Sequence, residues 1–434
     1  MVNKNISIPQ RGDRTIILLY LVLCCIGWVA IYAAGSGNSE LKFYDLRTDY
    51  GKQLLWIGTS FVIALFILLT DSKFFTAFSY IFYVLLLALL VATPLIGKVV
   101  HGQRNWIAIG QFQIQPAEFG KLAAAFAMAK FMSGLTVNLK NRRTRFICMG
   151  LFLLPAALVL LTGDTGSALV YLSFFLVMYR FGIEGYWLLL AVYFITLSVL
   201  VIVFNHWGWK YQLVFSLFSI GAVVVFMVRK NARTMLFTAI FFVGSIMYVF
   251  VEDFAFEKVL EQHQKDRIHV MLGLPVYEMK GGKQILKKDA DYNVRFSKIA
   301  IGSGGFLGKG FLQGTVTNGN FVPEQTTDFI FTTIGEEYGF WGGTLVIVLF
   351  LILLYRVLII AERQRSVFSR VYAYCVACII FFHLLVNVGM TLGLMPVIGI
   401  PLPFFSYGGS SLWSFTILLF VLVKLDSDRL AVLR

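Results

Sequence analysis

Residues 16–34 read IILLYLVLCCIGWVAIYAA, an almost uninterrupted apolar run that follows a polar, basic N-terminal segment. A run of about twenty such residues is long enough to cross the roughly 30 Å hydrocarbon core of a bilayer as one α-helix. The run is too long for the apolar region of a cleaved signal peptide, and many similar runs follow it. We therefore interpret it as a retained first transmembrane helix.

Eleven further apolar stretches repeat this pattern, and together they predict an all-α polytopic membrane protein of about twelve transmembrane helices. The stretch 167–179 is short, and two glycines interrupt the chain before it, which is typical of a broken or re-entrant hairpin. The expected spans are 16–34, 54–70, 76–96, 117–132, 147–161, 167–179, 187–204, 213–228, 235–251, 339–360, 372–392 and 407–423.

The composition excludes a soluble globular protein. The 434-residue chain is 58% hydrophobic and 14% charged, and its mean hydropathy is +0.78. With 42 Phe, 19 Tyr and 8 Trp, it has more apolar surface than a water-soluble fold can cover with polar residues. The excess faces the lipid bilayer. The five cysteines all lie in apolar runs, so they indicate buried thiols and not a disulfide framework.

The net charge of +14 does not indicate nucleic acid as a partner, because membrane proteins concentrate Lys and Arg in their cytoplasmic loops. With both termini in the cytoplasm, all four basic clusters in short loops and at the C-terminus are cytoplasmic: 140–145, 229–233, 363–370 and 424–434. The same parity places three polar segments outside: 99–115, 163–166 and 252–327. The prediction is a single integral, multi-pass membrane domain over 1–434.

The segment 252–327 is the large extracytoplasmic loop of this domain. It is rich in Lys and Arg, but loops of this length translocate largely regardless of charge. A connection this long is usually functional or disordered. Its last part, including Gly308-Lys309-Gly310, is glycine-rich and poor in charge, so its backbone can approach a ligand closely, although a flexible loop has the same composition.

Charged residues near the outer end of the fourth span are the first candidates for a site. Pro116 suits the first helical turn, and Glu118 suits the positive end of the helix, so a capping role for Glu118 with Lys121 as its partner is one interpretation. Lys121, however, lies one turn deeper, where a lysine costs up to about 3 kcal/mol unless it faces a polar interior. This cost favours a polar cavity.

Three other places carry acidic or polar residues, each of which has both a structural and a functional interpretation. Asp328 precedes the tenth span and can be an N-cap, but capping does not explain Glu336 and Glu337 two turns later, so a functional role is favoured. Asp164 lies in a turn between two spans, where function and satisfaction of the turn amides are equally good interpretations. His383 lies within the eleventh span, and no metal-ligand spacing accompanies it, so hydrogen-bonded packing is expected there.

The C-terminal segment 394–411, LMPVIGIPLPFFSYGGSS, closely resembles the signature of the SEDS (shape, elongation, division and sporulation) family. Supporting motifs occur at 104–110, 115–121, 299–305, 308–310 and 321–337, so the resemblance covers nearly the whole chain. The segment 321–328 resembles the elongation branch of the family more than the division branch, which remains the alternative. Family members have ten spans, and the two extra ones are expected between 187 and 251.

The resemblance implies a peptidoglycan glycosyltransferase that polymerises lipid II on the outer face of the membrane and releases undecaprenyl pyrophosphate. It also implies a partner, a class B penicillin-binding protein (a PBP2-like transpeptidase), which cross-links the product. A divalent cation, Mg²⁺ or Mn²⁺, is an implied cofactor that the sequence itself does not demonstrate. No protein metal ligands are predicted.

The resemblance also assigns residues. The family's essential aspartate corresponds to Asp328, which we expect to be the general base that activates the acceptor hydroxyl. The predicted substrate-binding set is Arg104, Trp106, Glu118, Lys121, Lys309, Glu336 and Ser406. Arg104, Lys121 and Lys309 are the candidates for the phosphates, and Glu118 is expected to orient Lys121. The chain departs from the family at Thr326, where a His is usual, and in the run around Asp164.

Two other functions remain as alternatives. Twelve spans with intramembrane charges also suit a flippase for lipid-linked sugars, although no clear internal repeat supports one. A non-catalytic scaffold that recruits the cross-linking enzyme is the third hypothesis.

Overall fold

The computed structural model describes residues 13–36, 42–100, 103–110, 112–135, 137–258, 260–280, 283–287 and 291–430. The described chain is mostly helical, which confirms the predicted fold class. Ten of its helices are long and apolar enough to cross a membrane. The other two expected spans correspond to the shorter α4 (Pro116–Met132) and to the interrupted helix Thr165–Arg180. Lys288 and Arg434, from the predicted charged segments, lie outside the described residues.

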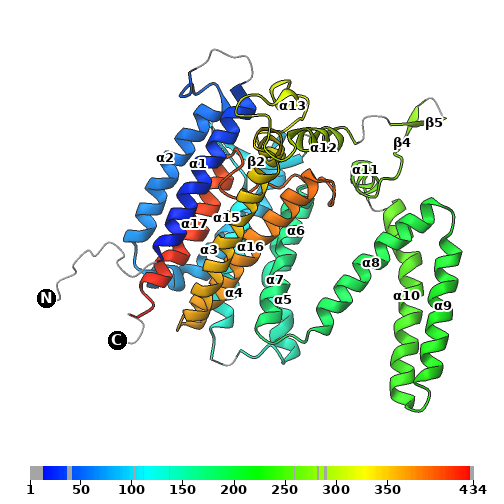
Figure 1. The fold of residues 1–434 in the computed structure, drawn as a ribbon. Helices are drawn as coiled ribbons and strands as arrows, with labels where there is room; N and C mark the ends of the chain where they lie inside the picture. The colour runs from blue at the N-terminus through cyan, green and yellow to red at the C-terminus, as the bar shows by residue number, and fades with distance from the viewer. Residues whose placement is uncertain are drawn as a thin grey trace. The chain divides into compact units, whose positions relative to one another are not determined.

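The chain divides into two compact units, unit 1 (Met1–Ile183 and Tyr292–Arg434) and unit 2 (Glu184–Asp291). The other helices of unit 1 are α1 (Arg14–Ser36), α2 (Asp49–Leu69), α3 (Ser72–Ile96), α5 (Arg142–Leu161), α6 (Thr165–Val170), the 3-10 turn η1 (Tyr171–Ser173), α7 (Phe174–Arg180), α12 (Tyr292–Gly304), α13 (Thr315–Asn318), α14 (Ile330–Glu337), α15 (Gly339–Arg363), α16 (Val367–Thr391) and α17 (Gly409–Ser427). Figure 1 shows them as a helical bundle with short elements at one end.

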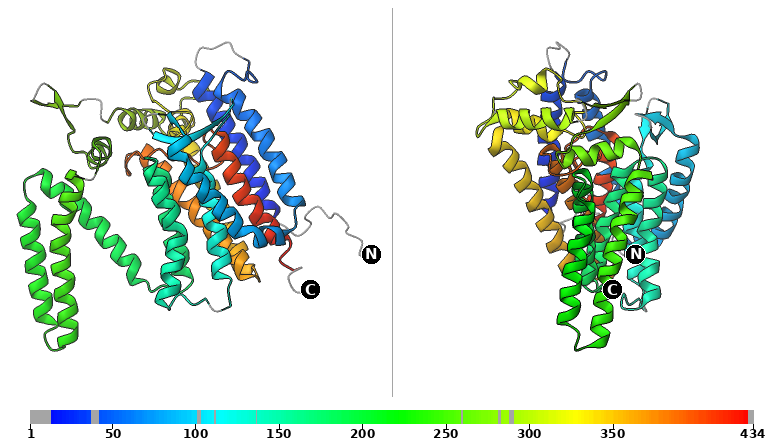
Figure 2. Two further views of the ribbon diagram at one scale, coloured as in Figure 1. Left: turned by 180° about the vertical axis from the view of Figure 1, so that it is seen from behind. Right: turned by 90° about the vertical axis from the view of Figure 1, so that its right-hand side faces the viewer.

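The core of unit 1 lies between α4, α16 and α17. Helix α4 is alanine-rich and buried around most of its circumference, because small side chains let neighbouring helices approach closely. The rings of Phe126 on α4 and Tyr372 on α16 stack with centroids 5.0 Å apart. Helices α2 and α3, by contrast, leave large apolar side chains such as Phe66 and Leu85 exposed, as lipid-facing helices do. Figure 2 shows α1, α2 and α17 packed side by side.

A small antiparallel sheet occupies part of the segment 99–115, which the sequence analysis placed outside the membrane. Its strands are β1 (Lys98–Val100), β2 (Gln103–Ile109) and β3 (Phe112–Ile114), in that order. Lys98 pairs with Trp106, and Ile107 pairs with Ile114. The apolar runs that predicted the transmembrane helices did not predict these strands. In Figure 1, β2 lies at the same end of unit 1 as α12 and α13.

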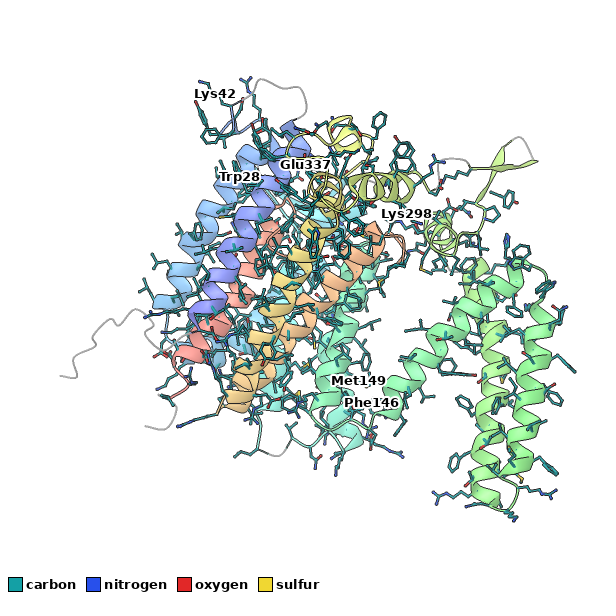
Figure 3. The ribbon with its side chains drawn as sticks, in the orientation of Figure 1. Trp28, Lys42, Phe146, Met149, Lys298 and Glu337 are labelled. Carbon is teal, nitrogen blue, oxygen red and sulfur yellow. The ribbon has the colours of Figure 1, made fainter. Side chains whose placement is uncertain are left out.

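The opposite end of unit 1 is held by buried carboxylates. Asp13 and Asp426 are buried, and Asp426 accepts hydrogen bonds from Arg363 Nε (2.8 Å) and Arg429 Nη1 (2.9 Å). Arg356 forms an ion pair with Asp13, so this network ties the start of α1 to the ends of α15 and α17. Figure 3 shows Phe146 and Met149, near the start of α5, at this end, away from Glu337.

Unit 2 contains α8 (Tyr186–His206), α9 (Lys210–Met227), α10 (Ala232–Lys258), α11 (Gln262–Met271) and the hairpin β4 (Tyr277–Lys280)–β5 (Lys283–Leu286). Its core is formed by Leu197, Val201, Leu213, Leu217 and Val249, contributed by α8, α9 and α10. Helix α10 runs past the expected span end at 251, so the predicted loop 252–327 begins within a helix. The described part of that loop carries α11, α12 and α13 and is therefore largely folded.

Candidate active site

The residues between α16 and α17 form a loop, 392–408, onto which the site is built. Ser406 is buried, and its hydroxyl donates to the Thr327 carbonyl (2.6 Å) while it accepts from the Leu402 amide (2.8 Å). The Tyr407 amide donates to the Thr326 carbonyl (2.9 Å). These bonds fix the backbone of residues 326–327, immediately before Asp328. Ser406, predicted as a substrate-binding residue, therefore contacts the segment that carries the predicted base.

Asp328 is partly exposed and lies between this loop and α16. The Asn387 amide on α16 donates to the Asp328 carbonyl (2.9 Å) and to the Ile400 carbonyl (2.8 Å). A Cβ added to Gly399 would come within 3.1 Å of Asp328 Oδ2, so the absence of a side chain there makes room for the carboxylate. The N-cap of α14 is Phe329, so Asp328 is not the helix cap that was one interpretation of its position.

Glu118, Lys121 and His383 form a buried polar cluster between α4 and α16. Lys121 Nζ lies 2.9 Å from Glu118 Oε1 and 2.9 Å from His383 Nε2, and the exposed fractions of the three residues are 1%, 2% and 0%. An ammonium group only donates, so His383 Nε2 accepts, and its Nδ1–H donates to the Pro401 carbonyl at 2.9 Å. These partners offset the cost of burying Lys121. The sequence analysis instead expected Lys121 to face a polar cavity.

This cluster and Asp328 are joined through α16 and the loop. His383 and Asn387 lie four residues apart and so share one face of α16. His383 binds the Pro401 carbonyl, and Asn387 binds the neighbouring Ile400 carbonyl. The buried Lys121 cluster and the backbone of Asp328 are thus attached to consecutive peptide groups. The sequence analysis interpreted His383 as hydrogen-bonded packing and assigned no role to Asn387. Two polar residues one turn apart in an apolar span are the sequence feature that could have indicated their shared role.

Lys309 and Glu336 come together at the far end of α14 from Asp328. Glu336 is fully buried and accepts from Lys309 Nζ (2.6 Å) and from the amides of Val316 and Thr317 (both 2.9 Å). Burial by itself raises the pKa of Glu336, but these hydrogen bonds lower the pKa by a larger amount. The pKa of Glu336 therefore lies below its usual value. Eight residues of helix extend about 12 Å, so this pair does not contact Asp328 directly.

The neighbouring Glu337 has the opposite character. It is 1% exposed, Oε1 accepts from the Leu312 amide (3.1 Å), and Oε2 has no hydrogen-bond partner among the described residues. Burial raises its pKa to about 7, which the hydrogen bond from Leu312 only partly counteracts. Together the two glutamates hold the loop 308–317 against the end of α14, and Figure 3 shows Glu337 there.

Arg104 and Trp106 both lie on β2, where Arg104 is exposed and Trp106 is half-buried. The strands are attached to the start of α17, because Ser410 Oγ donates to the Gln113 carbonyl (3.2 Å) and accepts from the Gln115 amide (3.2 Å). The three cations that were predicted to bind the phosphates differ in exposure. Arg104 is exposed, Lys309 is partly exposed in its pair with Glu336, and Lys121 is enclosed.

Asp164 serves the turn in which it lies. It is the N-cap of α6, accepting from the Ser167 amide (2.9 Å) and from Gln115 Nε2 (2.7 Å). Its neighbour Gly166 has no room for a Cβ, which would come within 2.2 Å of the Ile398 carbonyl oxygen. The sequence analysis left open whether Asp164 has a functional role or binds the amides of its own turn. The hydrogen bond from the Ser167 amide matches the second interpretation.

The described residues contain no group of three or more His, Cys, Asp or Glu side chains placed to hold a metal ion. A divalent cation of the kind that the family resemblance implies would have to take part of its oxygen ligands from the substrate's phosphates, as Mg²⁺ commonly does.

The fold and the site define a multi-pass membrane protein with a hydrogen-bonded acidic centre at one end of its helical bundle. The model of the FtsW, RodA and SpoVE cell cycle proteins matches residues 13–220 and 214–430. The chain therefore belongs to this family, the SEDS family, and proteins named RodA are among its relatives.

Individual relatives cover almost the full length. The peptidoglycan glycosyltransferase RodA of Treponema pallidum (strain Nichols) is 32% identical over 96% of this chain and 98% of its own length. The peptidoglycan glycosyltransferase MrdB of Escherichia coli (strain K12) is 28% identical over 92% of this chain and 89% of its own.

Solved structures show the same fold. A chain from a peptidoglycan synthase complex that coordinates polymerization and crosslinking has a TM-score of 0.65 at 23% identity and covers 97% of this chain and 99% of its own. The RodA of Thermus thermophilus has a TM-score of 0.60 at 22% identity and covers 97% and 98%.

Proposed function

We propose that this chain is a peptidoglycan glycosyltransferase of the elongation type that polymerises lipid II on the outer face of the cell membrane. The observation that carries the proposal is the setting of Asp328, a partly exposed carboxylate whose backbone is held by Asn387 while Gly399 leaves space beside its side chain. The full-length similarity to proteins named peptidoglycan glycosyltransferases supports the same activity.

In the proposed reaction Asp328 is the general base. Its carboxylate takes the proton from the 4-hydroxyl of the acceptor's terminal GlcNAc, and the hydroxyl oxygen then forms a bond to the anomeric carbon of the donor. The bond between that carbon and the pyrophosphate oxygen breaks, and undecaprenyl pyrophosphate leaves with the electron pair. Asp328 holds the proton until it is released to solvent, so protons and charge balance.

The predicted substrate-binding residues take different roles in this proposal. Arg104 is exposed on β2 and is the cation most available to the departing pyrophosphate, with Trp106 beside it on the same strand to pack against a sugar. Lys121 is enclosed between Glu118 and His383, so it acts by positioning the loop and by its charge. Lys309 and Glu336 order the loop 308–317, and Lys309 is the second candidate for the phosphates. Ser406 positions the backbone before Asp328.

The proposed orientation puts both termini in the cytoplasm of the cell (inner) membrane and Asp328 outside. The basic residues at the start of α5 and the end of α15 support it, because such residues concentrate on the cytoplasmic side. The proposed partner is a class B penicillin-binding protein that cross-links the new strands. The similarity to a chain from a peptidoglycan synthase complex supports a synthase partner.

The test is polymerisation of labelled lipid II by the purified full-length protein in detergent, where no second leaflet exists and a flippase has no reaction to perform. Wild type is expected to form glycan chains, and Asp328→Asn is expected to form none. Asp71→Asn is the matched control, because Asp71 caps α3 and Asn caps a helix equally well. Full activity of Asp328→Asn, with both variants folded, contradicts the proposed base. No polymer from the wild type, with and without the cross-linking partner, favours the flippase or the scaffold.

A further inference from the structure

Unit 2 contains a cleft of about 200 Å³ that plays no part in the site described above. It lies where the C-terminal parts of α8 and α10 meet α11, and every lining residue belongs to unit 2. Val201, Ile202 and Phe256 form its apolar part. The polar part consists of Asn205, His206, Glu252, Asp253, Lys265 and His269.

The two carboxylates in the cleft differ in their hydrogen bonding. Asp253 is satisfied, because Asn205 Nδ2 donates to its Oδ1 (2.7 Å) and Lys210 forms an ion pair with its Oδ2. Glu252 Oε2 is buried and has no hydrogen-bond partner among the described residues. A buried acceptor without a donor is costly, so a ligand that brings an N–H group to this oxygen gains what the protein lacks. The nearby C-terminus of α8 also favours a positive charge.

The residues next to the cleft place it at the depth of lipid headgroups. Trp207, Trp209 and Tyr211 follow His206 at the turn between α8 and α9, and all three side chains are exposed. Exposed Trp and Tyr at the ends of spanning helices concentrate at the membrane–water interface. The polar part of the cleft therefore lies among headgroups, while Val201 and Ile202 lie a turn further into α8, toward the acyl chains.

The other wall of the cleft carries groups that suit an anion. Lys265 and His269 lie four residues apart on α11, on one face of the helix. The ring centroid of His206 lies 6.4 Å from that of His269, so α8 and α11 each contribute an imidazole to this part of the cleft. A ligand with an amine at one end and a phosphate nearby matches both walls.

We propose that this cleft binds the headgroup of a phospholipid bearing a protonated primary amine, of the phosphoethanolamine class. The ammonium group donates to Glu252 Oε2, the phosphate faces Lys265 and His269, and the acyl chains follow the apolar surface of α8. A phosphocholine headgroup has the same charges but no N–H group, so it leaves Glu252 Oε2 without a donor.

The first experiment varies the lipid and uses only the wild-type protein. Full-length protein in detergent is titrated, with native mass spectrometry as the readout, with phosphatidylethanolamine, its N-methyl and N,N-dimethyl derivatives, and phosphatidylcholine, all with the same acyl chains. Phosphatidylethanolamine is expected to bind about tenfold more tightly than phosphatidylcholine, with affinity falling as methyl groups are added. Free O-phosphoethanolamine is the arm that separates a membrane lipid from a soluble amine, and it is expected to compete weakly. Equal affinity along the methylation series overturns the proposal.

The second experiment locates the site. Glu252→Gln is expected to reduce the preference for phosphatidylethanolamine, because a neutral amide oxygen accepts a weaker hydrogen bond from the ammonium group, and to weaken the binding of both lipids, because each carries a cationic nitrogen. Glu184→Gln is the matched control, because Glu184 is exposed in the same unit, before the opposite end of α8. Retention of the full preference by a folded Glu252→Gln protein also overturns the proposal. Thermal unfolding of both variants checks the fold, and the methylation series remains decisive if Glu252→Gln does not fold.

Discussion

The side-chain amide of Asn387 donates to the backbone carbonyl of Asp328 over 2.9 Å, and it donates its second hydrogen to the Ile400 carbonyl over 2.8 Å. One side chain on α16 thereby joins the segment that carries the proposed base to the loop 392–408. Because both contacts are to backbone groups, Asn387 fixes the place of Asp328 without contacting the reacting carboxylate.

Asn387→Ala is expected to lower kcat by about 10- to 30-fold and to leave KM nearly unchanged, because it removes two hydrogen bonds worth about 2 kcal/mol together. Steady-state polymerisation of lipid II measures both constants. A rise in KM alone contradicts this positioning role.

Gly399→Ala is expected to reduce polymerisation strongly. Gly399 has φ +67°, and the new Cβ lies within 3.1 Å of Asp328 Oδ2. Gly273→Ala is the matched control, because Gly273 has φ +68° with nothing within 4 Å of an added Cβ. Both variants carry backbone strain of the order of 1 kcal/mol, but only the first crowds the carboxylate. Equal activity of the two variants shows that the space beside Asp328 is not required.

Lys121→Met is expected to lower the free energy of unfolding by about 3 to 5 kcal/mol, because it leaves Glu118 buried without its ion-pair partner. The double variant Glu118→Gln/Lys121→Met is expected to recover most of that loss. Lys130→Met, on the last turn of the same helix, is the control. Thermal unfolding in detergent measures all three, and a stable single variant contradicts the pairing.

Glu337 is expected to make the loop 308–317 less stable as the pH rises. Its folded-state pKa, raised to about 7 by burial, lies above the ordinary glutamate pKa of 4.5, so the stabilisation is complete below about pH 4.5 and is lost as the pH rises through 7. Glu337→Gln removes this loss and is expected to be more stable than wild type at pH 8, by roughly 3 kcal/mol.

The contribution of Glu336 to stability changes with pH in the opposite direction. Its pKa lies below the usual value, so its contribution is present at neutral pH and is lost only in acid. Unfolding midpoints measured between pH 3 and 8 test both glutamates, with Glu184→Gln as the control. A Glu337→Gln curve parallel to that of wild type contradicts the assignment.

Apolar run length was sufficient to predict the membrane helices, because a spanning helix must satisfy its own backbone and show an apolar surface to lipid. The same pattern did not distinguish lipid-facing α3 from the enclosed α4, since an alanine-rich helix and a lipid-facing one are both apolar. The strands at 98–114 were missed because short pairs depend on their docking to α17 through Ser410, which no local pattern records.

Motifs predicted individual candidate site residues, but they did not predict which of these residues lie together. Glu118 and Lys121 are three residues apart, so their pairing follows from helix geometry. The partnership of Lys121 with His383 and of Lys309 with Glu336 depends on how distant segments pack. Whether a charge lies in an open cavity or among partners is likewise a property of the packed bundle, and Lys121 is the example.

The side chains of Asn387 and His383 bind the loop 392–408 through the consecutive carbonyls of Ile400 and Pro401. These two hydrogen bonds do not depend on which side chains residues 400 and 401 carry. They do depend on the number of residues in the loop, because an inserted or deleted residue between 398 and 406 would move each carbonyl past its donor. Chain length in this stretch is therefore constrained together with the residues whose own atoms the site uses, such as Gly399 and Ser406.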